Sequence, residues 1–351
     1  MLKGVLLGLA IMGGFSLPLA AQSPFLVGAD VNYALPMEKE GHTWSLDGQP
    51  TDLFTILHRA GFNTVRLRIW TGDESLEAAC ELARRARAQG LGILPVLFLS
   101  ENWADYVKQP IPTIWKDLSF DDRVKAVQAY AARVAARFPD QELFEIGNEI
   151  DFGICGEFEE EWGKRLNPAY MKAAIWPRMA RLIRAAEDGV RQTNPHAKFI
   201  LHLTQWWNPA FCTACFQTMT ASGVTVDYAG LSFYPTSGLS QENSFAAFQS
   251  STAQLNQATQ LPIIICEFGY PSEPSFPGQF ATWNHPVAGF TLDEAGQAQY
   301  LKAFLEVTHS TPYVQGVIYW SPEWYTSDMW SAFALFTPQG HPKPALLQFQ
   351  K

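Results

Sequence analysis

Short apolar runs alternate with segments of helical periodicity along nearly the whole chain of 351 residues. An apolar run of strand length between turn residues is typical of a buried strand, and apolar residues spaced by three and four positions are typical of a helix packed on one face. Eight runs are expected to be strands: residues 25–31, 64–70, 91–99, 142–148, 199–204, 227–234, 262–266 and 314–320. Seven helices are expected between them: residues 51–60, 75–89, 120–138, 170–193, 209–221, 244–258 and 293–309.

The count and the order of these elements predict an α/β fold, a closed (β/α)8 TIM barrel whose last helix is truncated. The alternative is an open doubly wound sheet, which usually has a glycine-rich turn after its first strand; this sequence lacks one. No repeat or low-complexity linker divides the chain, so residues 22–351 are assigned to a single barrel domain. The segments after the strands are long and the returns from helix to strand are short, so function is expected at the carboxyl ends of the strands.

The composition is that of a folded, acidic protein. Hydrophobic residues make up 47% of the chain, charged residues make up 17%, and the formal net charge is -9. This apolar content is enough for a large core, and an acidic chain without a basic cluster repels phosphate backbones, so nucleic acid is not expected as a partner. The 12 Trp offer flat indole faces for stacking on sugar rings, with burial in the core as the alternative for each.

The first residues have the pattern of a signal peptide. Lys3 provides a positive charge, residues 4–19 are apolar but interrupted by Gly and Pro, and Ala20 and Ala21 offer a cleavage site. Residues 1–21 are therefore assigned to a signal peptide, with an uncleaved membrane anchor as the alternative. The mature protein is expected to be secreted or periplasmic, free of the membrane and monomeric.

Five cysteines bear on this assignment, because an exported protein can form disulfides. Cys155, Cys212 and Cys215 fall after consecutive strands. A bridge from Cys155 to either of the other two, or between Cys212 and Cys215, is therefore expected, with free thiols or a zinc site as alternatives. Cys80 and Cys266 lie in apolar patterns and are expected to be buried and unpaired.

Two glutamates stand where buried strands end. Asn148 and Glu149 close the fourth strand, and Glu267 follows the apolar run of the seventh. Burial of a carboxyl group without a local partner is costly, and such groups gather at functional sites. The fourth and seventh strands face each other across a barrel, so both side chains can reach one pocket. Glycoside cleavage needs such a pair of carboxyl groups, one on each side of the scissile bond. The alternative for each glutamate is a structural ion pair with an arginine.

These residues and several other segments resemble clan A of the glycoside hydrolases and, within it, family 53, the arabinogalactan endo-β-1,4-galactanases. The resemblance rests on residues 28–31, 52–54, 61–70, 103–105, 146–150, 230–235 and 267–271, which follow the family's order and are spread over most of the length of the mature chain. It implies a retaining hydrolase of a β-linked polysaccharide, with Glu149 as the acid/base and Glu267 as the nucleophile.

The resemblance also implies roles for the residues around this pair. Asn148 would hold the sugar 2-hydroxyl, Arg66 would keep the nucleophile ionised, and Tyr234 would donate a hydrogen bond to it. The remaining candidates for substrate binding are Trp320, as the floor of subsite −1, with Asp30 and Trp103. Arg66 could instead pair inside the barrel, and Asp30 could instead hold a loop.

Two departures from the family concern residues that border the substrate. Family 53 enzymes usually carry a His near the end of strand three, where this chain has Phe98, and residues 151–158 do not continue as the family does. Some bacterial members bind calcium in the loop after strand seven, but no matching set of oxygen ligands is evident in residues 268–292, so no metal or cofactor is assigned.

The sequence therefore predicts a secreted endo-β-1,4-galactanase that acts on galactan or arabinogalactan. One alternative is a clan A enzyme for mannan, glucan or another glycan. The other is a barrel that binds carbohydrate without cleaving it.

Overall fold

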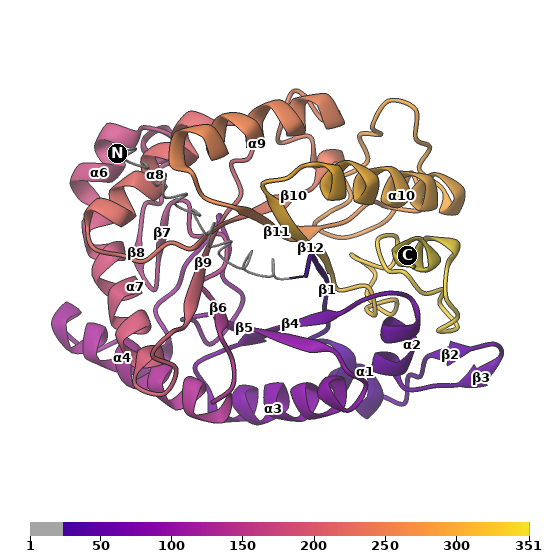
Figure 1. Cartoon of the computed structure of the whole chain (residues 1–351), viewed down its shortest axis with the longest axis horizontal. Helices are drawn as coiled ribbons and strands as arrows, with labels where there is room; N and C mark the ends of the chain where they lie inside the picture. Colours follow the sequence, from indigo (N-terminus) through magenta and orange to yellow (C-terminus); the bar gives the residue numbers. More distant parts are fainter. Residues whose placement is uncertain (1–23, 351) are drawn as a thin grey trace, which may run out of the picture.

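Eight parallel strands close into a barrel at the centre of the molecule (Figure 1). The computed structural model describes residues 24–350, so the predicted signal peptide lies outside the described residues. The barrel strands are β1 (Leu26–Asp30), β4 (Thr64–Ile69), β5 (Gly92–Leu97), β6 (Leu143–Ile146), β9 (Lys198–Leu203), β10 (Tyr228–Phe233), β11 (Ile263–Phe268) and β12 (Val314–Trp320). Their order is β1-β12-β11-β10-β9-β6-β5-β4, and β1 pairs with both β4 and β12 to close the ring. The predicted TIM barrel is confirmed.

Helices surround the strands on the outside (Figure 1). Seven of them overlap the seven predicted helices: α2 (Leu53–Arg59), α3 (Asp73–Ala88), α4 (Phe120–Arg137), α7 (Trp176–Arg191), α8 (Pro209–Ala221), α9 (Phe245–Thr259) and α10 (Glu294–Ser310). These helices bury apolar residues spaced by three and four positions, the pattern from which they were predicted. For example, α3 buries Leu76, Ala79 and Leu82 on one face. The last unit ends in a 3₁₀ helix, η3 (Pro344–Phe349), in place of a full helix. None of the helices within residues 24–350 is both long and apolar enough to cross a bilayer.

The helix predicted over residues 170–193 is wrong in one respect, because it is two helices. α6 (Pro168–Ala174) ends before Ile175, and α7 starts at Trp176. Pro177 explains the break, since a proline has no N–H to donate and its ring collides with the carbonyl four residues earlier.

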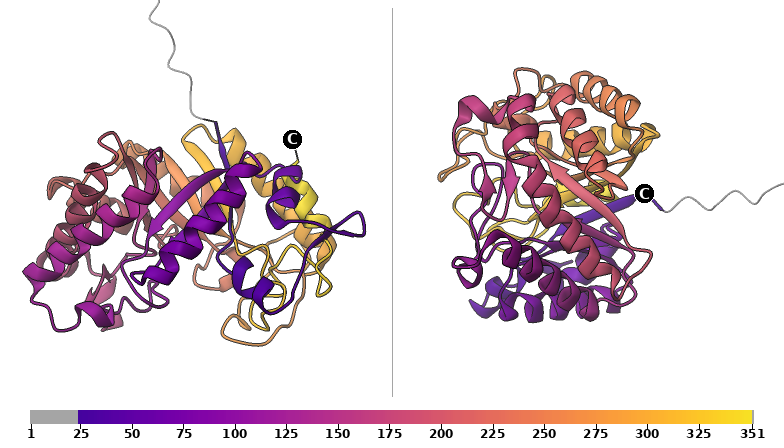
Figure 2. Two further views of the ribbon diagram at one scale, coloured as in Figure 1. Left: turned by 90° about the horizontal axis from the view of Figure 1, so that it is seen from below. Right: turned by 90° about the vertical axis from the view of Figure 1, so that its left-hand side faces the viewer.

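The long segments after the strands contain small elements that the sequence did not predict. These are α1 (Ala34–Lys39), the hairpins β2 (Ser45–Leu46) with β3 (Gln49–Pro50) and β7 (Gly153–Ile154) with β8 (Glu157–Phe158), α5 (Trp162–Arg165), η1 (Thr113–Trp115) and η2 (Pro235–Ser237). Figure 2 shows the loops around residues 270–290 and 321–343 gathered at the end of the barrel opposite the start of β1. This is the face formed by the carboxyl ends of the strands, where function was expected.

Inside the barrel, an apolar layer supports that face from below. It consists of Leu94, Ile200, Ile264, Cys266 and Ile318, all buried. The next inward position toward the carboxyl end is polar on β9, where it is His202, and apolar on β5, where it is Val96. Both are buried, so the site rests on a packed floor and not on an open channel.

Candidate active site

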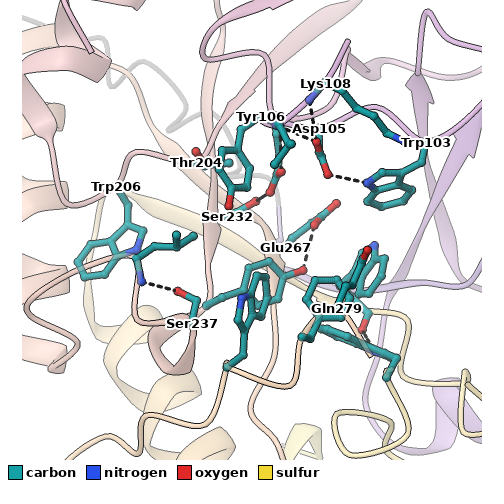
Figure 3. Close-up of a pocket in the computed structure, with 18 of the residues that line it drawn as sticks. Trp103, Asp105, Tyr106, Lys108, Thr204, Trp206, Ser232, Ser237, Glu267 and Gln279 are labelled. Carbon is teal, nitrogen blue, oxygen red and sulfur yellow. Dashed lines mark hydrogen bonds between the residues drawn. The ribbon is translucent and has the colours of Figure 1, made fainter. Parts of the chain in front are cut away.

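A pocket of about 390 Å³ opens at the carboxyl ends of the strands. Its wall is rich in aromatic rings: Trp103, Tyr106, Trp206, Trp207, Tyr234, Phe280, Trp283, Trp320 and Trp330. In Figure 3, Trp103 and Asp105 lie on one side of Glu267, and Trp206 and Ser237 lie on another. Glu149 lines the same pocket as Glu267. A concave site with flat apolar walls and convergent carboxyl groups suits a carbohydrate ligand.

Glu149 is aimed into the pocket by an unusual turn after β6. Both Gly147 (φ 74°) and Glu149 (φ 50°) have left-handed backbone conformations, which are rare for a residue with a Cβ atom. β6 therefore ends at Ile146, two residues earlier than the sequence predicted. Burial, and then the negative charges of Glu267 and Asp105, raise the pKa of Glu149 well above its usual value. Glu149 can therefore hold a proton where an ordinary glutamate is ionised.

Glu267 reaches the pocket because β11 is irregular. The prediction that this strand stops at Cys266 is wrong, since β11 runs through Glu267 to Phe268. The pairing of β11 with β10 shifts between Ile265 and Glu267. In a regular strand successive side chains point to opposite faces, yet Cys266 lies in the barrel interior and Glu267 lines the pocket. The bulge turns both toward the barrel axis.

Two donors hold the carboxylate of Glu267. Nη1 of Arg66 donates to Oε1 at 2.8 Å, and the hydroxyl of Tyr234 donates to Oε2 at 2.9 Å. Burial, and then the charge of Glu267, raise the pKa of Tyr234 well above its usual value, so this hydroxyl remains a donor. Glu267 is thus fixed in orientation from two sides.

Arg66 is buried completely and joins several acids behind the pocket. It donates to Asp30 Oδ2 at 2.8 Å and, through two nitrogens, to both oxygens of Glu145. Although burial opposes it, the charge and hydrogen bonds of Arg66 lower the pKa of Glu145 to about 2. Arg68 adds a second buried cation, 3.0 Å from Asp30 Oδ1.

The family model for Glycosyl hydrolase family 53 matches residues 26–349. The chain belongs to glycosyl hydrolase family 53. It is 28% identical over 347 residues to an arabinogalactan endo-β-1,4-galactanase of Humicola insolens, covering 92% of this chain and 98% of the relative. It is also 28% identical to a probable arabinogalactan endo-β-1,4-galactanase A of Aspergillus niger, with 85% of each chain covered.

Solved structures of family 53 have the same fold. The catalytic domain from Ignisphaera aggregans matches with a TM-score of 0.80 at 24% identity, covering 94% of this chain and 97% of that one. A structure described among two fungal β-1,4-galactanases matches with a TM-score of 0.79 at 26% identity, covering 93% and 99%. This family 53 chain is therefore a glycoside hydrolase built on a TIM barrel.

The predicted site residues of this family 53 enzyme fall into two groups. Five line the pocket: Glu149, Glu267, Tyr234, Trp320 and Trp103. The other three, Arg66, Asn148 and Asp30, are fully buried behind its wall. Asn148 accepts from Arg66 at 2.8 Å and donates to the carbonyl of Ala104 at 3.0 Å. The second N–H of the Asn148 amide has no acceptor among residues 24–350, whereas Asp30 is engaged by two arginines. The roles of all eight stay predictions.

Sequence reasoning missed three buried polar residues, Glu145, His202 and Ser232. His202 lies between the other two, with Nδ1 2.9 Å from Glu145 and Nε2 2.8 Å from Ser232. Each stands alone in an apolar strand, and that isolation is the signal that could have found them. Their partners could not be predicted, because these depend on how four strands align around the barrel.

A metal ion does not fit this cluster. Glu145, His202 and Cys266 each place one ligand atom within 4.8 Å of the other two. Both oxygens of Glu145 already accept hydrogen bonds from Arg66, so a metal would have to displace a guanidinium. The cluster is therefore assigned to a hydrogen-bond network.

The expected disulfide is wrong, because all five cysteines are free. Cys212 and Cys215 both lie on α8 and face the core, and the thiol of Cys212 donates to the carbonyl of Gln205 at 3.2 Å. Cys155 is buried in the turn between β7 and β8. Burial raises the pKa of all three thiols, which disfavours the thiolate that zinc needs. Cys80 is unpaired as expected but only partly buried.

Phe98 confirms that strand three lacks the family's imidazole at this position. The ring is fully buried, 5.4 Å from the ring of Trp70 and 5.9 Å from that of Trp103. Because Trp103 lines the pocket, Phe98 supports an apolar part of the pocket wall.

Proposed function

We propose that this family 53 enzyme is a secreted, retaining endo-β-1,4-galactanase with Glu149 as the acid/base and Glu267 as the nucleophile. The observation that carries the proposal is the unequal environment of two carboxyl groups in one pocket. Glu149 is buried beside negative charges, whereas Glu267 accepts hydrogen bonds from Arg66 and Tyr234. Such a difference assigns one group as proton donor and the other as anion.

The proposed reaction has two steps. In the first, Glu267 attacks the anomeric carbon while Glu149 gives its proton to the leaving oxygen, forming a glycosyl ester on Glu267. In the second, Glu149 takes a proton from water, the resulting hydroxide oxygen bonds to the anomeric carbon, and Glu267 leaves as a carboxylate. Two inversions retain the β configuration.

The surrounding residues would bind and orient the sugar. Trp320 and Trp103 offer flat faces to the sugar, and the free N–H of Asn148 would reach the 2-hydroxyl. Arg66 and Tyr234 would hold the nucleophile in line, with Asp30 fixing Arg66 from behind. Galactan is the proposed substrate because the similar chains from Humicola insolens and Aspergillus niger carry that activity in their names.

A panel of β-linked polysaccharides with product analysis by NMR tests this proposal. We expect release of short oligosaccharides from β-1,4-galactan, with the β-anomer appearing first, and little product from mannan or glucan. Glu149→Gln and Glu267→Gln should each lower turnover at least about a thousandfold while substrate still binds. Initial release of the α-anomer would show inversion, and cleavage of another glycan alone would overturn the substrate assignment.

A further inference from the structure

The hydroxyl of Ser232 lies between Glu149 and a histidine that no assigned role explains. Its oxygen is 2.6 Å from Oε1 of Glu149 and 2.8 Å from Nε2 of His202. Ser232 belongs to β10 and His202 to β9, and both side chains are buried. A serine hydroxyl has one hydrogen, so it can donate to only one of these neighbours.

The hydrogen of Ser232 points to Glu149 throughout the proposed reaction. For Glu149 to protonate a leaving oxygen, its proton must be on Oε2, since Oε1 faces Ser232. Oε1 is then an acceptor both before and after the proton is given away. The 2.6 Å distance is in the range of a hydroxyl that donates to a carboxyl oxygen. Nε2 of His202 must therefore donate to Ser232.

The other ring nitrogen of His202 must also carry a hydrogen. Nδ1 lies 2.9 Å from Oε1 of Glu145, a carboxylate that can only accept. Arg66 Nη2 is 3.4 Å from the same nitrogen but has no hydrogen to spare for it. All five N–H groups of Arg66 already have acceptors, which are Glu145 (two bonds), Asp30, Glu267 and Asn148.

We propose that His202 is a positively charged positioning residue that stabilises the ionised form of Glu149 through Ser232. The inference rests on the proposed acid/base role of Glu149. When Glu149 gives its proton to the leaving oxygen, its new negative charge is met by a hydroxyl that is itself polarised by an imidazolium. Glu145 and Arg66 anchor the far side of that imidazolium.

Within the buried ion pairs that include His202, the charges are balanced only if His202 is protonated. These ion pairs join three anions, Asp30, Glu145 and Glu267, with Arg66, Arg68 and His202. With a neutral histidine the group would carry an unbalanced negative charge in a medium where such a charge is costly. The other groups that face Glu149 are Asp105, Asp151, Tyr106 and Tyr234, which are anionic or neutral, and Cys266 is the further neighbour of His202.

Nitrogen-15 NMR of histidine-labelled enzyme tests the charge directly, because it is measured on the wild-type network. The His202 signals are identified by their loss in His202→Phe. At pH 7 we expect both ring nitrogens of His202 to be protonated. A ring with one unprotonated nitrogen at that pH would overturn the proposal.

The pH dependence of kcat/KM tests the effect on Glu149. His202→Phe replaces the imidazole with a phenyl ring, which carries no charge and has neither donor. Without the imidazolium, the pKa of Glu149 should rise, so the basic limb of the kcat/KM profile should move up by about one pH unit. This is the size expected for the loss of one charge-assisted contact. Turnover should fall about tenfold or more for an oligosaccharide and little for an aryl glycoside whose leaving group needs no proton. Ser232→Ala should show the same selectivity, and Ser232→Thr, which keeps a hydroxyl, should restore activity.

His309→Phe is the matched control, because His309 lies on α10 away from the pocket and should leave the basic limb in place. A downward or absent shift in His202→Phe, or equal losses on both substrates, would overturn the role of His202. Glu149→Ala with the aryl glycoside and azide separates the two proposals. If azide does not yield a β-glycosyl azide, the acid/base assignment itself fails; if it does, only the role of His202 is in question.

Discussion

Glu267 shows how single hydrogen bonds fix a reactive group. Its two oxygens accept from Arg66 on β4 and Tyr234 just after β10, so the carboxylate cannot rotate without breaking a bond to a fixed partner. The donors come from strands on different sides of β11, which the barrel brings together. The position of each oxygen is thus set by the fold and not by the loop that follows.

Tyr234→Phe should lower kcat/KM about ten- to a hundredfold, since a hydrogen bond to a charged group contributes about 1.5–3 kcal/mol. The ring and its packing remain, so the loss measures the hydroxyl. Tyr313→Phe removes a hydroxyl that donates to the carbonyl of Gln249, away from the pocket, and should leave kcat/KM unchanged. Equal activity of Tyr234→Phe and the wild type would show that Arg66 alone orients Glu267.

At the level of elements, the strands could be predicted because each apolar run is buried on both faces of the barrel wall. What the sequence could not reveal is local geometry, namely the bulge in β11 and the two hairpins in the loops. The helix break before Pro177 was missed although the proline that causes it is visible in the sequence. Glu149 and Glu267 were recognisable as carboxyl groups at strand ends. Glu145, His202 and Ser232 were not, because their meaning depends on the register of neighbouring strands.

The turn after β6 allows a test of how local backbone geometry positions Glu149. A Cβ atom at Gly147 would lie 2.4 Å from Cγ2 of Ile150 and 2.7 Å from Cδ1 of Ile154, and the φ of 74° disfavours any side chain. Gly147→Ala should lower the free energy of unfolding by about 1–3 kcal/mol and reduce turnover by moving Glu149. Gly163→Ala is the control, because a Cβ there meets nothing within 4 Å. Full activity in Gly147→Ala would mean that this turn does not aim Glu149.

For the whole molecule, buried carboxyl groups link stability to pH. Burial raises the pKa of Asp151 to about 6, of Glu187 to about 7 and of Glu323 to about 8, and it raises the pKa of Glu149 well above its usual value. In the unfolded chain these groups titrate near pH 4. Between about pH 4 and 8 the folded protein therefore binds more protons than the unfolded chain, so stability falls as pH rises. Glu145 acts in the opposite sense, but only below about pH 4.5, because its pKa in the folded protein is about 2.

The melting temperature should consequently be highest near pH 4 and decline toward pH 8, because each group can contribute up to about 1.4 kcal/mol per pH unit between its unfolded and folded pKa values. Glu323→Gln removes one such group and should flatten the decline, whereas Glu306→Gln, at an exposed position on α10, should not. Calorimetry in buffers of different ionisation enthalpy would measure the protons released on unfolding at pH 6. A melting temperature that rises from pH 5 to 8 would mean that these carboxyl groups are ionised in the folded enzyme.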